Sequence, residues 1–255
     1  MPEHRFHTPG PVELDVSVPS GQIVVETVDG EESTVVLEGS ERALENAVVD
    51  FDGTRLTVSM RNRGPLGFTI EIGDITFGSG SGGKLNVHAT VPHASRAALN
   101  TASADMRLRG RFAGLQTKSA SGDLVVDGLV EGDATVKTVS GDARLPDIGG
   151  SLQMQSVSGD LRVQTVGGSL TAKSVSGDVR AESLREGEAT MQSVSGDIHL
   201  GVAEGTNVDV DANSVSGDLS SDVPLGADPT GVHTDGPTLV VRGKTVSGDF
   251  KLVRA

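Results

Sequence analysis

The tripeptide Ser-Gly-Asp returns along the second half of the chain at nearly constant steps. Its aspartate stands at positions 123, 142, 160, 178, 197, 218 and 249, and a degenerate copy, Ser-Ala-Asp, ends at Asp105. Successive aspartates are 18, 19, 18, 18, 19, 21 and 31 residues apart. A nearly fixed period is the signature of a repeat architecture, in which each unit packs only against its neighbours. The chain is therefore predicted to be a repeat protein.

Within this period the apolar residues follow a finer repeat of nine. Its members are Val139, Ile148, Val157, Val166, Val175 and Leu184. Between them apolar and polar residues alternate, as in a strand with one buried face. Because nine is odd, the alternation slips once per unit, so that Ser174 and Val175 would both point inward. We expect a corner at each slip, where the following glycine relaxes the limits on the backbone.

These patterns predict an all-β fold, a single-chain β-solenoid. Two nine-residue sides give a coil of about 18 residues, and stacked coils form a parallel β-helix with right-handed winding. An antiparallel β-meander is the alternative, because Ser-Gly-Asp and Gly-Gly are also suited to hairpin turns.

The repeat is regular only in the second part of the chain. Residues 1–100 are predicted to form an irregular β N-terminal part, a cap that is continuous with the solenoid. Ser40 is expected to cap a short helix there. Residues 101–255 form the regular repeat solenoid. Three prolines interrupt it near the C-terminus, so residues 220–244 are expected to be an insertion.

Composition argues against several classes of function. The net charge of −14 disfavours binding to a phosphate backbone, and the basic residues stand singly among acids with no basic stripe. No aromatic ring occurs from residue 113 to 249, which disfavours sugar stacking. There is no signal peptide and no long apolar segment. We therefore expect a cytoplasmic protein that neither binds nucleic acid nor inserts into a membrane.

The aspartates of the corners are the candidate binding residues. In a solenoid they would stack at the strand spacing of about 4.8 Å. Arg144, Arg162 and Arg180 follow their aspartates by two residues and would offset the repulsion. The candidates are Asp123, Asp142, Asp160, Asp178, Asp197 and Asp218. The competing interpretation is that Ser and Asp side chains cap the backbone amides of the corners.

No catalytic residue, metal site or cofactor is predicted. The calcium-binding nonapeptide repeat has two glycine positions with an aspartate two residues beyond the second, whereas here the aspartate directly follows a single glycine. The histidines lack the spacing of metal ligands. His88 and His93 are the closest inner pair, and we expect both to be solvated.

The reiterated motif T/S-V-S-G-D-[LVI]-x-[VL], together with the opening PVELDVSVPSGQIVVETVDGEE, resembles the DUF4097 or toastrack family of bacterial β-strand-repeat proteins. Members of that family are often labelled putative adhesins. The resemblance covers the chain from about residue 10 to 255. It implies a non-enzymatic all-β repeat domain, of a kind found in cell-envelope stress contexts and thought to bind peptides or surface partners. It supplies no catalytic or ligand residues.

The function predicted from these observations is a non-enzymatic repeat scaffold or binding module. It would engage an unknown protein partner through its solenoid faces, with a link to cell-envelope stress or adhesion. The alternative is a self-assembling structural solenoid, a homo-oligomer formed by end-to-end or lateral stacking. The least favoured function is that of a polysaccharide-active β-helix enzyme.

Overall fold

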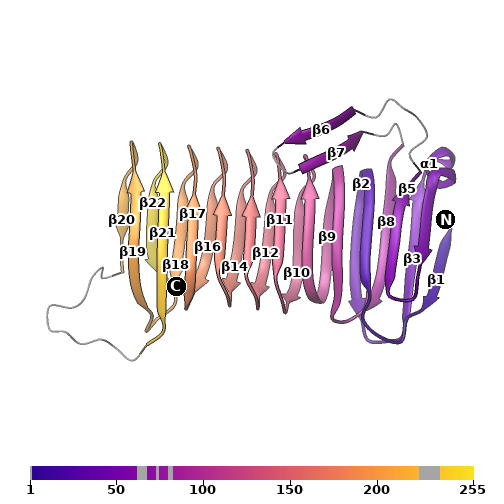
Figure 1. The fold of residues 1–255 in the computed structure, drawn as a ribbon, viewed down its shortest axis with the longest axis horizontal. Helices are drawn as coiled ribbons and strands as arrows, with labels where there is room; N and C mark the ends of the chain where they lie inside the picture. Colours follow the sequence, from indigo (N-terminus) through magenta and orange to yellow (C-terminus); the bar gives the residue numbers. More distant parts are fainter. Residues whose placement is uncertain (1, 62–67, 73–74, 80–82, 224–235) are drawn as a thin grey trace.

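In the computed structural model the chain forms an elongated stack of β-strands with its N-terminus at one end (Figure 1). The structure describes residues 2–61, 68–72, 75–79, 83–223 and 236–255. The elements in chain order are β1 (Glu3–His7), β2 (Glu13–Val28), β3 (Glu32–Gly39), α1 (Glu41–Asn46), β4 (Ala47–Phe51), β5 (Arg55–Met60), β6 (Phe68–Ile72), β7 (Ile75–Ser79), β8 (Leu85–Pro92), β9 (Ser95–Ser119), β10 (Leu124–Val130), β11 (Ala134–Thr138), β12 (Ala143–Ile148), β13 (Leu152–Gln155), β14 (Leu161–Val166), β15 (Leu170–Lys173), β16 (Val179–Leu184), β17 (Gly187–Gln192), β18 (Ile198–Val202), β19 (Asn207–Ser214), β20 (Leu219–Ser221), β21 (Thr238–Thr245) and β22 (Phe250–Arg254). Strands β6 and β7 form a separate antiparallel pair.

Two parallel faces run along the solenoid. The first face consists of β10, β12, β14, β16, β18, β22 and β20, and the second of β11, β13, β15, β17, β21 and β19, each in spatial order. The long strand β9 joins both, because its residues 106–112 pair with β10 and its residues 115–119 pair with β11. All these ladders are parallel. The predicted solenoid is therefore confirmed, and the antiparallel meander is wrong for this region.

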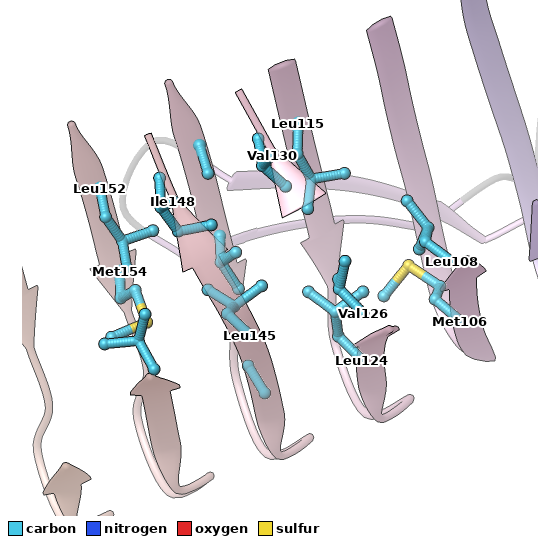
Figure 2. Packing of buried hydrophobic residues seen from close by; sticks show 14 of the residues in the cluster. Met106, Leu108, Leu115, Leu124, Val126, Val130, Leu145, Ile148, Leu152 and Met154 are labelled. Atoms are coloured by element: carbon cyan, nitrogen blue, oxygen red, sulfur yellow. The ribbon is translucent and has the colours of Figure 1, made fainter. Parts of the chain in front are cut away.

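Apolar side chains from the two faces fill the space between them (Figure 2). On β14, Leu161 and Val163 are buried, whereas Arg162 between them is exposed. Leu170 and Ala172 of β15 are fully buried. Burying one such aliphatic side chain contributes about 1.5–3 kcal/mol. Because each coil supplies several of them, thin aliphatic layers are enough to hold the stack together.

The two halves of a coil differ more than the nine-residue repeat predicts. Ile148, Val166 and Leu184 end strands of the first face, and their exposed fractions are 1%, 4% and 0%. Val175, nine residues from Val166, is 43% exposed. Only Ser174 of the predicted inward pair is buried. The inward position of Val175 is thus a wrong prediction, because the corner buries the serine hydroxyl and turns the valine outward.

Antiparallel strands close the N-terminal end. β1 pairs with β3, β3 with β8, and β4 with β5, all antiparallel. β2 then pairs in parallel with β5, β8 and β9 and so connects this end to the regular coils. The side chain of Ser40 accepts the backbone N–H of Ala43, which confirms the predicted helix cap. The ring centroids of Phe6 and Phe51, from β1 and β4, lie 5.5 Å apart.

The last coil in sequence is not the last coil in space. β21 pairs with β17 on one side and with β19 on the other. β22 lies in the same way between β18 and β20. Figure 1 shows the yellow strands β21 and β22 within the orange end of the stack. The chain therefore completes the outermost coil first and then inserts its final strands behind it.

The insertion expected at residues 220–244 is narrower in the structure. β20 extends to Ser221 and β21 begins at Thr238, so both flanks of the expected insertion belong to the solenoid. Residues 224–235, which contain most of the remainder, lie outside the described part of the chain.

Candidate binding surfaces of the solenoid

Each Ser-Gly-Asp corner is fixed from the inside by a hydroxyl, which is buried in every coil except the outermost, where Ser214 is half-buried. Oγ of Ser156 accepts the backbone N–H of Gly159 at 2.8 Å, and Ser156 is only 7% exposed. The equivalent bond in the other coils is made by Thr101, Ser119, Thr138, Ser174, Ser193, Ser214 and Thr245. The residue that opens the repeated motif T/S-V-S-G-D is therefore a cap for the corner backbone.

The corner glycine is required by contact with the preceding coil. A Cβ at Gly159 would lie 2.1 Å from the backbone oxygen of Gly141, and a Cβ at Gly177 would lie equally close to that of Gly159. None of these glycines is among the residues with positive φ. The predicted reason, relaxed backbone limits, is therefore wrong. Glycine is needed because the coils pass too close together for a side chain.

The corner aspartates form a continuous hydrogen-bonded series, here named the Asp ladder. Oδ1 of Asp142 accepts the backbone N–H of Asp160, and Oδ1 of Asp160 accepts that of Asp178, both at 3.0 Å. In spatial order the Asp ladder consists of Asp105, Asp123, Asp142, Asp160, Asp178, Asp197, Asp249 and Asp218. The structure thus brings the six candidate residues together and adds the first and the second-last member.

These hydrogen bonds give the Asp ladder a structural role. In each coil but the outermost, one carboxylate oxygen is engaged by the next coil. Nη2 of Arg162 lies 3.5 Å from Oδ2 of Asp160, as the predicted charge compensation requires. Arg180 instead pairs with Glu182 at 2.9 Å, so its expected pairing with Asp178 is wrong. Partner binding by the Asp ladder stays a prediction.

Basic residues that stand singly in the sequence form a row on the first face. Arg144, Arg162, Arg180, His199 and Lys251 are neighbours in register on successive strands. Basic residues that are isolated in the sequence therefore align in space. The row runs two residues from the Asp ladder, however, and its arginines contact carboxylates. This stripe is consequently one of mixed charge.

From β9 to β17 the second face carries two polar rows without a carboxylate, here named the Lys-Gln-Thr face. One row is Lys118, Lys137, Gln155, Lys173 and Gln192, and the other is Gln116, Thr135, Gln153, Thr171 and Thr190. Beyond β17 the rows continue to Lys244 and Arg242 on β21 and to Asn213 and Asp211 on β19. None of the three lysines of the Lys-Gln-Thr face forms an ion pair with any residue that the structure describes. The signal was present in the sequence, as the polar residue two positions before each corner valine. These residues were not among the predicted binding residues.

His93, expected to be solvated, is held at the end of β8. Its Nδ1 lies 2.7 Å from Oγ1 of Thr27, and its Nε2 lies 3.6 Å from Oδ1 of Asp29. A carboxylate, an imidazole and a hydroxyl in this order resemble a hydrolase triad. Oγ1 of Thr27 also accepts the backbone N–H of Arg111 at 2.8 Å, and a Cβ at Gly110 would lie 2.2 Å from this oxygen. The backbone thus covers the hydroxyl, and the cluster fixes the turn between β8 and β9.

Neither a metal-binding cluster nor a membrane-spanning helix is found among the described residues. In that part of the chain, no three or more His, Asp or Glu side chains are grouped so that they could hold a metal ion. The same residues include no helix with the length and apolarity needed to cross a bilayer.

Nearly the whole chain resembles one known protein family. A family model described as Toastrack DUF4097 matches residues 12–253. The chain belongs to this family. The resemblance in the corner motif is thereby confirmed. The match begins after β1 and includes the rest of the antiparallel N-terminal end and nearly all of the inserted last coil, so these are parts of the toastrack domain.

Solved structures align with this chain over nearly its whole length at low sequence identity. A protein of Parabacteroides distasonis ATCC 8503, described as a putative lipid binding protein, aligns with a TM-score of 0.57 and 15% identity, over 98% of this chain and 96% of its own. A putative adhesin of Bacteroides fragilis NCTC 9343 aligns with a TM-score of 0.44 and 15% identity, over 98% and 95%. The first likeness supports the fold alone. No curated protein is detectably similar in sequence.

Proposed function

We propose that this toastrack chain is a non-enzymatic binding scaffold that engages a protein partner through the Lys-Gln-Thr face. The observation that carries the proposal is the absence of any carboxylate from the two rows of that face, in a chain of net charge −14. A partner with an acidic surface would be attracted to this face and repelled by most of the remaining surface.

The geometry of the face suits an extended contact. Neighbouring rows are in register along β11, β13 and β15, so amide, hydroxyl and ammonium groups recur at the strand spacing of about 4.8 Å. Lys173 is exposed, while Lys137 and Gln155 are half-buried against their neighbours. Held by a parallel sheet, these groups lose little freedom on binding, which favours affinity.

Two observations support the non-enzymatic part of the proposal. The carboxylates of the Asp ladder accept hydrogen bonds from the scaffold itself, which ties them to the fold. The hydroxyl of Thr27 beside His93 is covered by backbone. The link to adhesion or envelope stress, and the cytoplasmic location, stay predictions.

The test is a pull-down from the native host followed by measurement of the Kd for the partner that is recovered. Replacing Lys118, Lys137 and Lys173 together by Gln is expected to weaken binding about tenfold or more. The matched control removes three charges from the first face, by replacing Arg144, Arg162 and Arg180 with Gln. Equal weakening by both variants, or by neither, would contradict the proposed face.

Self-assembly is the second candidate function, and one observation favours it. The outermost coil, formed by β19 and β20, has a free side within the described residues. Light scattering across a concentration series decides between the two functions. A binding scaffold predicts a constant particle mass, whereas end-to-end stacking predicts a mass that grows with concentration.

A further inference from the structure

The two ends of the solenoid are built differently. At the N-terminal end, antiparallel strands and α1 leave the regular pattern of coils. At the other end, the outermost coil still follows the repeat. Within the described residues, β19 pairs only with β21, and β20 pairs only with β22. Among the described residues, therefore, no strand pairs with the backbone N–H and C=O groups on the other side of residues 208–214 and of β20, and a strand edge of this kind can pair with a further strand.

Apolar side chains of this outermost coil are more exposed than their counterparts in the inner coils. Leu219 is 51% exposed, although its register neighbours Phe250 and Ile198 in the two coils behind it are 3% and 0% exposed. Val215 is 78% exposed, whereas Val246 at the same place in the next coil inward is 42% exposed. These apolar side chains are exposed because no further coil packs against them among the described residues.

The Asp ladder also stops at this coil. Oδ1 of Asp249 accepts the backbone N–H of Asp218 at 2.9 Å. The carboxylate of Asp218 accepts no corresponding N–H from any described residue. Exposed apolar positions, unpaired strand edges and an unused ladder acceptor thus coincide at one end of the molecule.

We propose that the free side of β19 is a docking site for an extended segment of a partner protein. The segment adds as one more parallel strand and alternates apolar side chains with Lys or Arg. Its apolar residues cover the half-buried Val208 and Val210, and its basic residues lie beside Asp209 and Asp211. This site lies outside the Lys-Gln-Thr face and goes beyond the function proposed for it.

The negative charge of β19 favours a partner segment with basic residues. Asp209 and Asp211 are exposed, and neither forms an ion pair with a described residue. Like charges on adjacent strands destabilise a sheet, whereas opposite charges stabilise it. A second copy that docked through its own β19 would bring acid against acid. A basic segment is therefore favoured over self-pairing.

The chain itself shows which kind of strand β19 accepts. On its inner side β19 pairs with β21, whose sequence is TLVVRGKT. Leu239 and Val241 of that strand are buried, while Arg242 lies beside Asp211 and Lys244 beside Asn213. The inner partner thus already combines inward apolar residues with outward basic ones. The free side presents the same alternation of valine and aspartate to solvent.

The test uses the full chain and a labelled synthetic peptide of sequence TLKVRGKT, with both ends blocked. In the register of β21, its first Lys lies beside Asp209 and its Arg lies beside Asp211. Fluorescence anisotropy at low salt is expected to show saturable binding. A peptide with Glu in place of Arg and Lys is the control and is expected not to bind. Replacing Asp209 and Asp211 by Asn should weaken binding about tenfold. Replacing the exposed Glu131 and Glu186 by Gln removes the same charge elsewhere and should leave the Kd unchanged.

Hydrogen exchange then shows where the peptide lies. Addition to the free edge predicts slower exchange in residues 207–214 and unchanged exchange in residues 238–245. Three results would overturn the proposal. They are the absence of saturable binding, equal weakening by the two charge variants, and faster exchange in residues 238–254, which would mean that the peptide replaces β21. The first of these would assign Asp209 and Asp211 to protection of an edge against aggregation.

Discussion

Asp249 donates its backbone N–H to Oδ1 of Asp197 at 2.9 Å, although 52 residues separate them in sequence. This bond shows that the final strands lie between two coils that are consecutive in the chain. The order of coils in space therefore differs from their order in sequence.

This coil order can be tested by disulfide cross-linking, because the chain contains no cysteine. His199 and Lys251 are register neighbours on β18 and β22, and Lys251 neighbours Ser220 of β20. We expect the pair His199→Cys and Lys251→Cys to cross-link on mild oxidation, whereas His199→Cys and Ser220→Cys should not. Mass spectrometry of the digested protein identifies the bond. Cross-linking of the second pair alone would mean that coils stack in sequence order.

The buried hydroxyl of a corner should matter more than the exposed one. Replacing Ser174 by Ala removes the acceptor of the N–H of Gly177 and should cost about 1–3 kcal/mol. Urea denaturation measures the loss. Ser176 is exposed, and its replacement by Ala should change stability by less than about 0.5 kcal/mol. Ser174→Thr should be tolerated, because threonine has this role at Thr138 and Thr245. Equal effects of the two alanine variants would contradict the cap.

The contact between corner glycines predicts a steep penalty for a methyl group. Gly159→Ala would place a Cβ 2.1 Å from the oxygen of Gly141, so the two coils would have to separate. We expect destabilisation of about 3 kcal/mol or more, measured by thermal unfolding. Gly10→Ala is the control, since nothing lies within 4 Å of its Cβ position. A Gly159→Ala variant as stable as the control would refute the steric account.

The two halves of a coil place equivalent valines in different environments, which allows a matched comparison. Val166 is 4% exposed and Val175 is 43% exposed. Replacing Val166 by Ala should cost about 2–3 kcal/mol, because it leaves a cavity in the core. The same change at Val175 should cost less than about 1 kcal/mol. Chemical denaturation of both variants checks this. Similar losses of stability in both variants would mean that the two half-coils are equivalent, as the nine-residue repeat predicts.

Much of the fold follows from local sequence signals. The spacing of Ser-Gly-Asp indicates the coil length, and alternation indicates the buried face of each strand. The outward turn of Val175 could not be predicted, because an apolar residue beside a buried serine looks like a core position. The place of β21 and β22 could not be predicted either. The step from Asp197 to Asp218 is 21 residues, close enough to the repeat for direct stacking.

The candidate residues were predicted as a set, and the interpretation that aspartate side chains cap corner backbone amides agrees with the structure, whereas the identity of the capped amide, that of the next coil, was not predicted. The sequence places the aspartates at equivalent corners, which is why all six come together. Whether a carboxylate faces a ligand or the next coil depends on the hydrogen bond that its Oδ1 makes, and spacing does not encode that bond. The row of Lys118 and Lys137 is marked in the sequence by a polar residue two positions before the corner, and the strand register shows that these residues are neighbours in space.

The Asp ladder as a scaffold element is the central claim, and one measurement tests it most directly. Asp142, Asp160 and Asp178 are replaced together, once by Asn and once by Ala, and the free energy of unfolding is determined in urea. Asn keeps an Oδ1 acceptor for the next backbone N–H, so it should change this free energy by less than about 1 kcal/mol. Ala removes three acceptors and should lower it by about 3 kcal/mol. Two variants as stable as the unchanged chain would contradict the claim.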